Sequence, residues 1–222
     1  MKSGDFVYID YIARIKDSGE IFDLTKEDVA KKEEIYNEKV KYRPVPVIVD
    51  GGFVIAGLND ALKEMNVGDK MSVAIEPEKA FGTRSEELVK LIPEARFKEQ
   101  GIDAVPGSYI NISNLRGKII SIDGGRVKVD FNHPLAGKAL EYEIEIIREI
   151  KEDSEKIKAV VCYFSGAEIE GVDVQVREKT AEIETKDVDI WKKTKDVIAS
   201  QITKWVPGIE TIKFIDVFKK TE

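Results

Sequence analysis

The sequence has one cysteine and one histidine in 222 residues, and this scarcity excludes several kinds of site. A single cysteine, Cys162, cannot form an internal disulfide, which suits a reducing compartment. Its neighbours Val160, Val161, Tyr163 and Phe164 are apolar, so we expect a buried thiol in a strand from 159 to 164. No histidine or second cysteine stands nearby to activate it.

His133 precedes a proline at the entrance of a predicted strand, where histidine is typical of packing or capping. With so little histidine and cysteine, the sequence offers no cluster for metal binding and no Ser/His or Cys/His pair for nucleophilic catalysis. The many carboxylates fall on solvated faces, which leaves a carboxylate-dependent hydrolase without support. We therefore expect no metal and no cofactor.

Long apolar runs and an excess of basic charge are also missing. No segment approaches the roughly 20 apolar residues that span a bilayer, and residues 1–5 lead directly into a strand, so we expect a cytoplasmic protein with no membrane partner. The net charge is −7, with 35 basic and 42 acidic residues interleaved, which argues against a nucleic-acid partner. Abundant Lys and Glu with scarce Gln are typical of thermophilic proteins.

The first part of the chain combines strands with short helices. A two-residue periodicity along residues 6–15 predicts a strand, and residues 16–20 predict a turn into Ile21 and Phe22. A charged segment at 25–37 predicts a surface helix, and an apolar stripe at 59–66 predicts a second helix before a strand at 71–75. We expect a curved antiparallel sheet wrapped on a short helix.

An insertion interrupts this first part. Residues 83–131 are far too many for an ordinary loop, and they are patterned. They predict strands at 109–115, 118–122 and 126–131, with a turn at Asp123-Gly124-Gly125. We therefore assign residues 1–83 and 130–150 to one discontinuous domain and residues 84–129 to an inserted, mostly β domain.

Residues 151–222 show a new pattern and predict a small C-terminal α+β domain. Strands are expected at 159–164, 172–176, 181–184 and 211–218, and a helix at 189–206. About 70 residues make a thin core, so this domain is expected to lean on its neighbours or on a second copy. Trp191 and Trp205 on one helix favour a homodimer, although both suit a core equally well.

Motifs in a fixed order carry the functional interpretation. Residues 51–58 read GGFVIAGL; Tyr11, Phe22 and Asp23 precede them, and AFG at 80–82 and LEY at 140–142 follow. This ordered set resembles the FKBP-type peptidyl-prolyl cis-trans isomerases. The insertion, together with NHPLAG at 132–137, resembles the SlyD-like branch with its insert-in-flap domain, and the extra C-terminal domain suits the archaeal long type.

The resemblance implies a small apolar basin that accepts a proline ring. In it, Asp23 would bond to the Tyr11 hydroxyl, and the backbone N–H of Ile55 would donate to a substrate carbonyl. The residues implied as catalytic are Tyr11, Asp23, Ile55, Phe81 and Tyr142; those implied in substrate binding are Phe22, Val54, Leu58, Leu135 and Leu140.

Three positions depart from the usual pattern of that family. Leu58 stands in place of the Trp floor, Phe81 replaces a Tyr whose hydroxyl would reach the substrate, and Tyr142 replaces a Phe. One missing hydrogen bond costs about 0.5–1.5 kcal/mol, so we expect a working but modest isomerase. The alternative is a holdase or interaction protein with a weak or inactive proline pocket.

The resemblance also implies that the inserted domain captures unfolded segments and delivers them to the basin. Partners would then be unfolded or partly folded proteins and proline-containing peptides. The candidate peptide-binding residues form an apolar group that is either the domain's core or an exposed client surface: Leu88, Leu91, Ile92 and Phe97.

Overall fold

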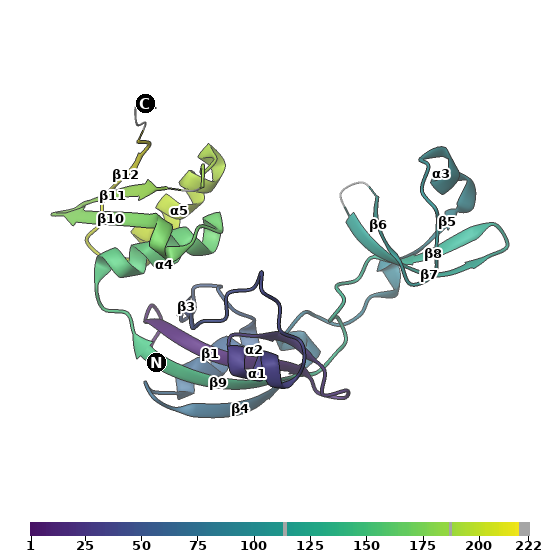
Figure 1. Cartoon of the computed structure of the whole chain (residues 1–222), viewed down its shortest axis with the longest axis horizontal. Coiled ribbons are helices and arrows are strands. Elements are labelled where there is room, and N and C mark those ends of the chain that lie inside the picture. The colour runs from purple at the N-terminus through teal and green to yellow at the C-terminus, as the bar shows by residue number, and fades with distance from the viewer. Residues whose placement is uncertain (113–114, 187, 218–222) are drawn as a thin grey trace. The chain divides into compact units, whose positions relative to one another are not determined.

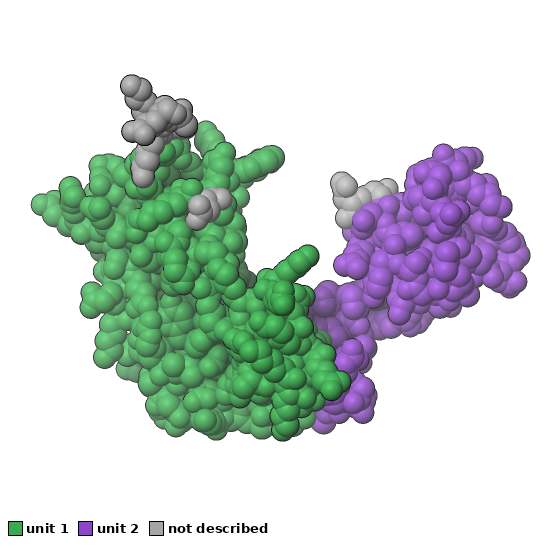
Figure 2. Space-filling model, in the orientation of Figure 1, with its two compact units in different colours: residues 1–14, 21–73, 141–222 green, residues 15–20, 74–140 purple. Residues whose placement is uncertain are grey.

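The computed structural model describes residues 1–112, 115–186 and 188–217. The chain forms two compact units, residues 1–14, 21–73 and 141–222 in the first and residues 15–20 and 74–140 in the second (Figure 2). The predicted strands at 109–115 and 211–218 each run partly outside the described residues. The fold is α+β with largely antiparallel sheets, as the sequence predicted. No described helix has the length and apolar character needed to cross a membrane.

The five-stranded sheet has the order β2-β1-β9-β4, with β3 paired to β1 (Figure 1). Along β9, buried Leu140, Tyr142, Ile144 and Ile146 alternate with acidic residues, so the sheet buries one face of this strand. The strands are β1 (Phe6–Ile15), β2 (Ile21–Leu24), β3 (Val45–Ile48), β4 (Lys70–Ile75) and β9 (Leu140–Glu149).

Two helices accompany this sheet, and their bounds differ from the sequence prediction. The segment 25–37 is helical only in α1 (Glu27–Lys32), and Glu34 just beyond it has a positive φ of 57°. Helix α2 (Ala56–Glu64) begins three residues before the predicted start at Asn59 and buries Leu58, Ala61 and Leu62. The turn before it requires glycine at position 51, because a Cβ there would lie 2.6 Å from the Cβ of Ile48.

The second unit contains a four-stranded sheet of order β5-β8-β7-β6 and the short helix α3 (Glu94–Glu99). Gly124 and Gly125 both have positive φ, which the tight turn between β7 and β8 requires. The core of this sheet consists of Phe97, Ile110, Ile119, Val127 and Val129. The strands are β5 (Val89–Pro93), β6 (Tyr109–Ile112), β7 (Leu115–Asp123) and β8 (Arg126–Asp130), with short 3-10 turns at Pro77–Lys79 and Glu86–Leu88.

The C-terminal part of the first unit is a three-stranded sheet that carries helices α4 and α5 (Figure 1). Strand β11 pairs antiparallel with β10 and parallel with β12. The elements are α4 (Asp153–Ser165), a 3-10 turn (Ile169–Gly171), β10 (Val172–Arg177), β11 (Thr180–Thr185), α5 (Lys192–Trp205) and β12 (Thr211–Ile215).

The predicted strand at 159–164 is wrong, because these residues lie in helix α4. Asp153 and Glu155 occupy the first turn, where acidic side chains favour a helix, and Gly166 ends the helix in the left-handed conformation with φ of 71°. The helix buries Ile157, Val160 and Val161 along one side. Cys162 is therefore a half-buried helix residue and not a strand residue.

Helix α5 buries Ile198 and Ile202 on one side, whereas Val197 is exposed. Trp191 caps the helix with 80% of its surface exposed, while half-buried Trp205 donates its indole N–H to Gln201. The two tryptophans therefore have different surroundings, and only Trp205 packs.

Candidate functional site

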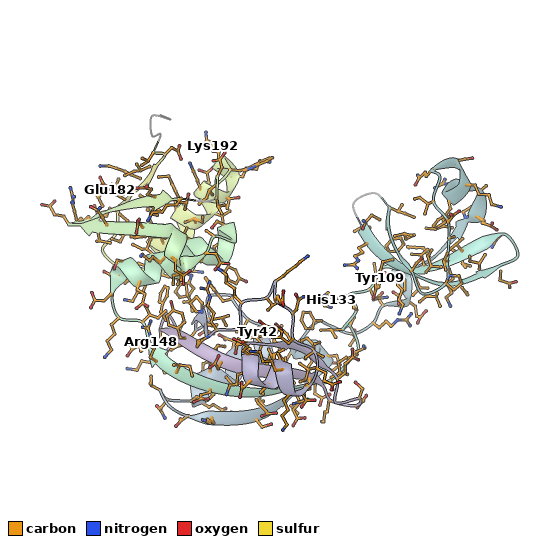
Figure 3. All side chains as sticks on the ribbon, viewed as in Figure 1. Tyr42, Tyr109, His133, Arg148, Glu182 and Lys192 are labelled. Atoms are coloured by element: carbon orange, nitrogen blue, oxygen red, sulfur yellow. The ribbon has the colours of Figure 1, made fainter. Side chains whose placement is uncertain are left out.

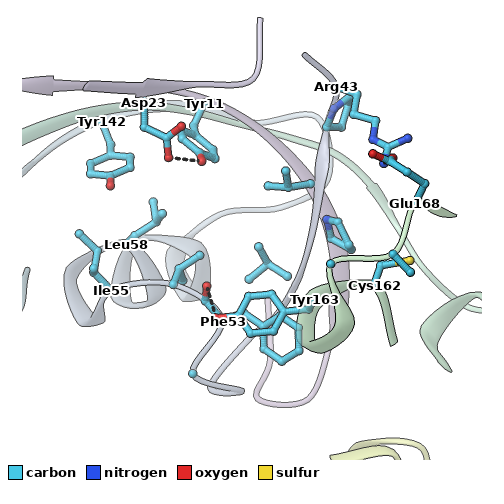
Figure 4. A pocket seen from close by; sticks show the side chains of 18 residues that line it. Tyr11, Asp23, Arg43, Phe53, Ile55, Leu58, Tyr142, Cys162, Tyr163 and Glu168 are labelled. Carbon is cyan, nitrogen blue, oxygen red and sulfur yellow. Dashed lines mark hydrogen bonds and ion pairs between the residues drawn. The ribbon is translucent and has the colours of Figure 1, made fainter. Parts of the chain in front are cut away.

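A cavity of about 670 Å³ opens in the first unit, where β1, β2, β9 and the start of α2 meet (Figure 4). Its lining is mostly apolar and includes six of the residues that the sequence assigned to a proline basin. The residues that line it are Tyr11, Asp23, Arg43, Pro44, Val45, Pro46, Val47, Gly52, Phe53, Val54, Ile55, Leu58, Tyr142, Cys162, Tyr163, Gly166, Ala167 and Glu168.

Tyr11 and Asp23 form a hydrogen-bonded pair on the cavity wall. The Tyr11 hydroxyl donates to a carboxylate oxygen of Asp23 at 2.7 Å, the pairing that the sequence implied (Figure 4). The backbone of Tyr11 is fixed by hydrogen bonds with the backbone N–H and the hydroxyl of buried Thr25. Burial and the neighbouring carboxylate raise the pKa of Tyr11, so the hydroxyl stays protonated and available as a donor.

Tyr142 extends the aromatic wall from β9. Its ring lies 5.8 Å from that of Tyr11 and 6.1 Å from that of Phe22, the latter in an edge-to-face arrangement. Burial, with a further contribution from Asp23, raises the pKa of Tyr142 to about 12. Phe22 supports Tyr142 and does not itself line the cavity.

The start of α2 supplies the opposite wall. Val54 and Ile55 precede the helix, and Leu58 in its first turn is only 2% exposed. Ile55 is the N-cap residue, and its carbonyl accepts the first helical bond, from the Asn59 N–H at 3.0 Å. The backbone N–H groups at this end therefore precede the helical hydrogen-bond ladder and have no partner within the helix.

Three of the residues predicted for the proline basin belong to the second unit, namely Phe81, Leu135 and Leu140. The ring of Phe81 stacks on His133 at 4.3 Å and 5°, and the Leu135 N–H donates to Nδ1 of His133 at 3.2 Å. His133, labelled in Figure 3, thus has the packing and capping role that its sequence context indicated. Leu140 is fully buried at the start of β9.

Sequence reasoning missed the part of the cavity that the loop before β3 and the C-terminal domain contribute. The ring of Phe53 lies 4.1 Å from that of Tyr163 and 6.0 Å from that of Phe164. Arg43 is ion-paired with Glu168 and Glu170. The incorrect strand at 159–164 hid this contribution; the acidic start and Gly166 were the signals of a helix.

The candidate peptide-binding residues of the inserted domain divide by exposure. Leu88 and Leu91 are 43% and 61% exposed, Ile92 is half-buried against the core, and Phe97 is 1% exposed. Of the two roles that the sequence left open, Phe97 has the core role, because α3 folds it onto the sheet. Leu88 and Leu91 remain surface residues.

Comparisons with known proteins agree with this architecture. A family model described as "FKBP26, IF domain" matches residues 90–135, and one described as "FKBP26_C-terminal" matches residues 153–219. A short-type peptidyl-prolyl cis-trans isomerase of Methanocaldococcus jannaschii is 38% identical over 146 residues, which cover 66% of this chain and 92% of the relative.

Isomerases from two bacteria are also similar to this chain. A probable FKBP-type 16 kDa peptidyl-prolyl cis-trans isomerase of Pseudomonas fluorescens is 36% identical over 47% of this chain and 71% of the relative. The SlyD isomerase of Haemophilus influenzae is 31% identical over 51% of this chain and 61% of the relative. With this coverage and the architecture described above, the chain belongs to the family of FKBP-type peptidyl-prolyl cis-trans isomerases.

Proposed function

We propose that this peptidyl-prolyl cis-trans isomerase acts at the cavity between Tyr11, Ile55, Leu58 and Tyr142, and that it accelerates protein folding. The observation that carries the proposal is the joint presence of an apolar cavity, the Tyr11–Asp23 hydrogen bond and the amide groups at the start of α2. The proline ring occupies the basin, and the Ile55 N–H donates to a carbonyl oxygen of the substrate.

The chemistry requires no nucleophile. Rotation about an Xaa-Pro bond is slow because the amide loses its resonance when twisted, with a barrier of about 18–20 kcal/mol. Twisting reduces the charge separation of the amide, so a dry apolar basin favours the twisted state more than water does. A ten-thousand-fold acceleration requires about 5.5 kcal/mol of such preference.

The N–H of Ile55 offers a sharp test, because its φ of −60° already suits proline. Ile55→Pro removes the donor and shortens the side chain, whereas the matched control Ile55→Ala shortens the side chain and keeps the donor. With a short proline peptide, we expect Ile55→Pro to lower kcat/KM about tenfold relative to Ile55→Ala, the value of one hydrogen bond. Equal kcat/KM values for the two variants would contradict the assigned donor.

For the inserted domain, we propose capture of unfolded segments. Leu88 just before β5 and Leu91 within it expose apolar surface, and β5 and β6 each pair with one neighbour in the sheet order. An extended client can add a strand at such an edge, which gives affinity without sequence selectivity. Suppression of the aggregation of an unfolded protein by the full chain tests this role.

We also propose that the C-terminal domain mediates self-association. Trp191 is 80% exposed, and a large exposed aromatic ring is typical of interfaces. A monomeric mass by light scattering at micromolar concentration would remove this proposal.

A further inference from the structure

We propose that helix α4 and the turn after it form a second peptide subsite beside the proline basin, which binds an apolar side chain flanking the substrate proline. The inference rests on the proposed function of the basin. Tyr163, Cys162, Ala167 and Glu168 of the C-terminal domain line the same cavity as Tyr11 and Leu58 (Figure 4).

The subsite has an aromatic wall. Tyr163 packs its ring against Phe53 at 4.1 Å, and its hydroxyl lies 3.5 Å from the Phe53 carbonyl oxygen. Tyr163 is nevertheless 48% exposed, so part of its surface is free to contact a ligand. Phe53 directly precedes Val54 and Ile55, so the wall of the subsite continues into the wall of the basin.

The floor and sides leave room for a side chain. Gly166 and Ala167 follow α4 and present little or no side-chain volume, while Pro44 and Pro46 face the cavity from the loop and β3. The two prolines lose little conformational freedom when a ligand binds, because their φ is already fixed. A preformed apolar subsite is the result.

The size of the cavity points to an occupant larger than one ring. Its volume of about 670 Å³ lies within the range of about 300–1,000 Å³ that accommodates drug-sized ligands. A proline ring fills only a fraction of that space. The remaining space extends to the C-terminal domain, where the next side chains of a bound peptide would lie.

Charge at the rim favours an apolar occupant. Lys41 and Arg43 pair with Glu168 and Glu170, so the two positive and two negative side chains neutralise one another. A charged side chain entering the subsite would gain no net attraction from this group and would lose hydration. An aromatic or large aliphatic side chain gains from burial against Tyr163 and Phe53.

The test compares short proline peptides with longer ones that carry a phenylalanine, or a matched alanine, at successive positions on either side of the proline. The kcat/KM of each peptide is measured by NMR exchange. For at least one position, we expect the phenylalanine peptide to have a kcat/KM about fivefold higher than the matched alanine peptide, because half of an aromatic ring is buried on binding. Tyr163→Ala should abolish this gain and leave the short peptide within about twofold. Tyr163→Phe should retain the gain. Tyr36→Ala is the control, because Tyr36 is 43% exposed, also stacks on a second aromatic ring and does not line the cavity.

Equal kcat/KM for all phenylalanine and alanine peptides would overturn the subsite while leaving the basin intact. An equal loss for short and long peptides in Tyr163→Ala would also overturn it, because Tyr163 would then only support the basin through Phe53. A lack of acceleration of the short peptide would instead contradict the basin.

A second measurement uses the unaltered chain and does not depend on catalysis. Cys162 is the single cysteine and lines the subsite, so its alkylation reports occupancy. Phenylalanine peptides should slow alkylation at least threefold at saturation, whereas alanine peptides should not. Equal protection by both would contradict the subsite even if the variants fail to fold.

Discussion

The Tyr11 hydroxyl and the Asp23 carboxylate, joined at 2.7 Å, connect β1 to β2 at the wall of the basin. The ring of Tyr11 therefore lines the basin, and its hydroxyl is held in one orientation. Asp23 is largely exposed, so this hydrogen bond is weaker than a buried one to a charged group.

Tyr11→Phe keeps the ring and removes the hydrogen bond. We expect kcat/KM for a short proline peptide to fall about two- to tenfold, which corresponds to about 0.5–1.5 kcal/mol. Because the pKa of Tyr11 is raised, this ratio should not change between neutral and mildly alkaline pH. Tyr36→Phe, on an exposed ring outside the cavity, is the control. An unchanged kcat/KM in Tyr11→Phe would show that the hydroxyl has no role.

Phe81→Tyr adds the phenolic hydroxyl that the family resemblance leads one to expect at this position. Phe81 stacks on His133, and a hydroxyl at the para position preserves the stacked ring. We expect catalysis on a short proline peptide to rise by up to about tenfold, the value of one added hydrogen bond. An unchanged or lower kcat/KM would contradict the role that the family resemblance implies for Phe81.

Substitutions at Leu91 and Phe97 distinguish a role in client capture from a role in the stability of the inserted domain. Leu91→Ser alters a side chain that is 61% exposed, so the free energy of unfolding should change by less than about 0.5 kcal/mol while suppression of aggregation weakens. Phe97→Ala removes a core side chain and should lower the free energy of unfolding of this domain by about 3–5 kcal/mol. Undiminished suppression of aggregation by Leu91→Ser would exclude Leu91 from the capture surface.

The alkylation rate of Cys162 should depend on pH in a way that reports its burial. Burial raises the pKa of this thiol to about 11, so less thiolate is present at a given pH than in an exposed cysteine. In the folded chain, the alkylation rate should keep rising about tenfold per pH unit well above pH 9, whereas in the unfolded chain it should level off near the ordinary thiol pKa of about 8.5. A plateau near pH 8.5 in the folded chain would contradict the burial of this thiol.

The sequence predicted the strands and turns of the sheet domains because their signals are local. Residues 6–15 form β1 over the whole predicted range, and the Asp123-Gly124-Gly125 turn separates two strands that pair as expected. The Tyr11–Asp23 pair was also predicted, because the family resemblance implies this hydrogen bond.

The errors arose where tertiary packing overrides local preference. The β-branched and aromatic residues of 159–164 favour a strand, yet helix α4 buries Val160 and Val161 on one side and leaves Tyr163 to pack on Phe53. The contribution of Tyr163 to the cavity depends on its contact with Phe53, which lies 110 residues away in the sequence. No periodicity within either segment carries that information.

The most direct test is NMR exchange of a short Xaa-Pro peptide with and without catalytic amounts of the unaltered chain. We predict interconversion far faster than the uncatalysed tens to hundreds of seconds, in proportion to the protein concentration and reduced in Ile55→Pro. An exchange rate that the protein leaves unchanged would contradict the assignment of the basin as a site of prolyl isomerisation.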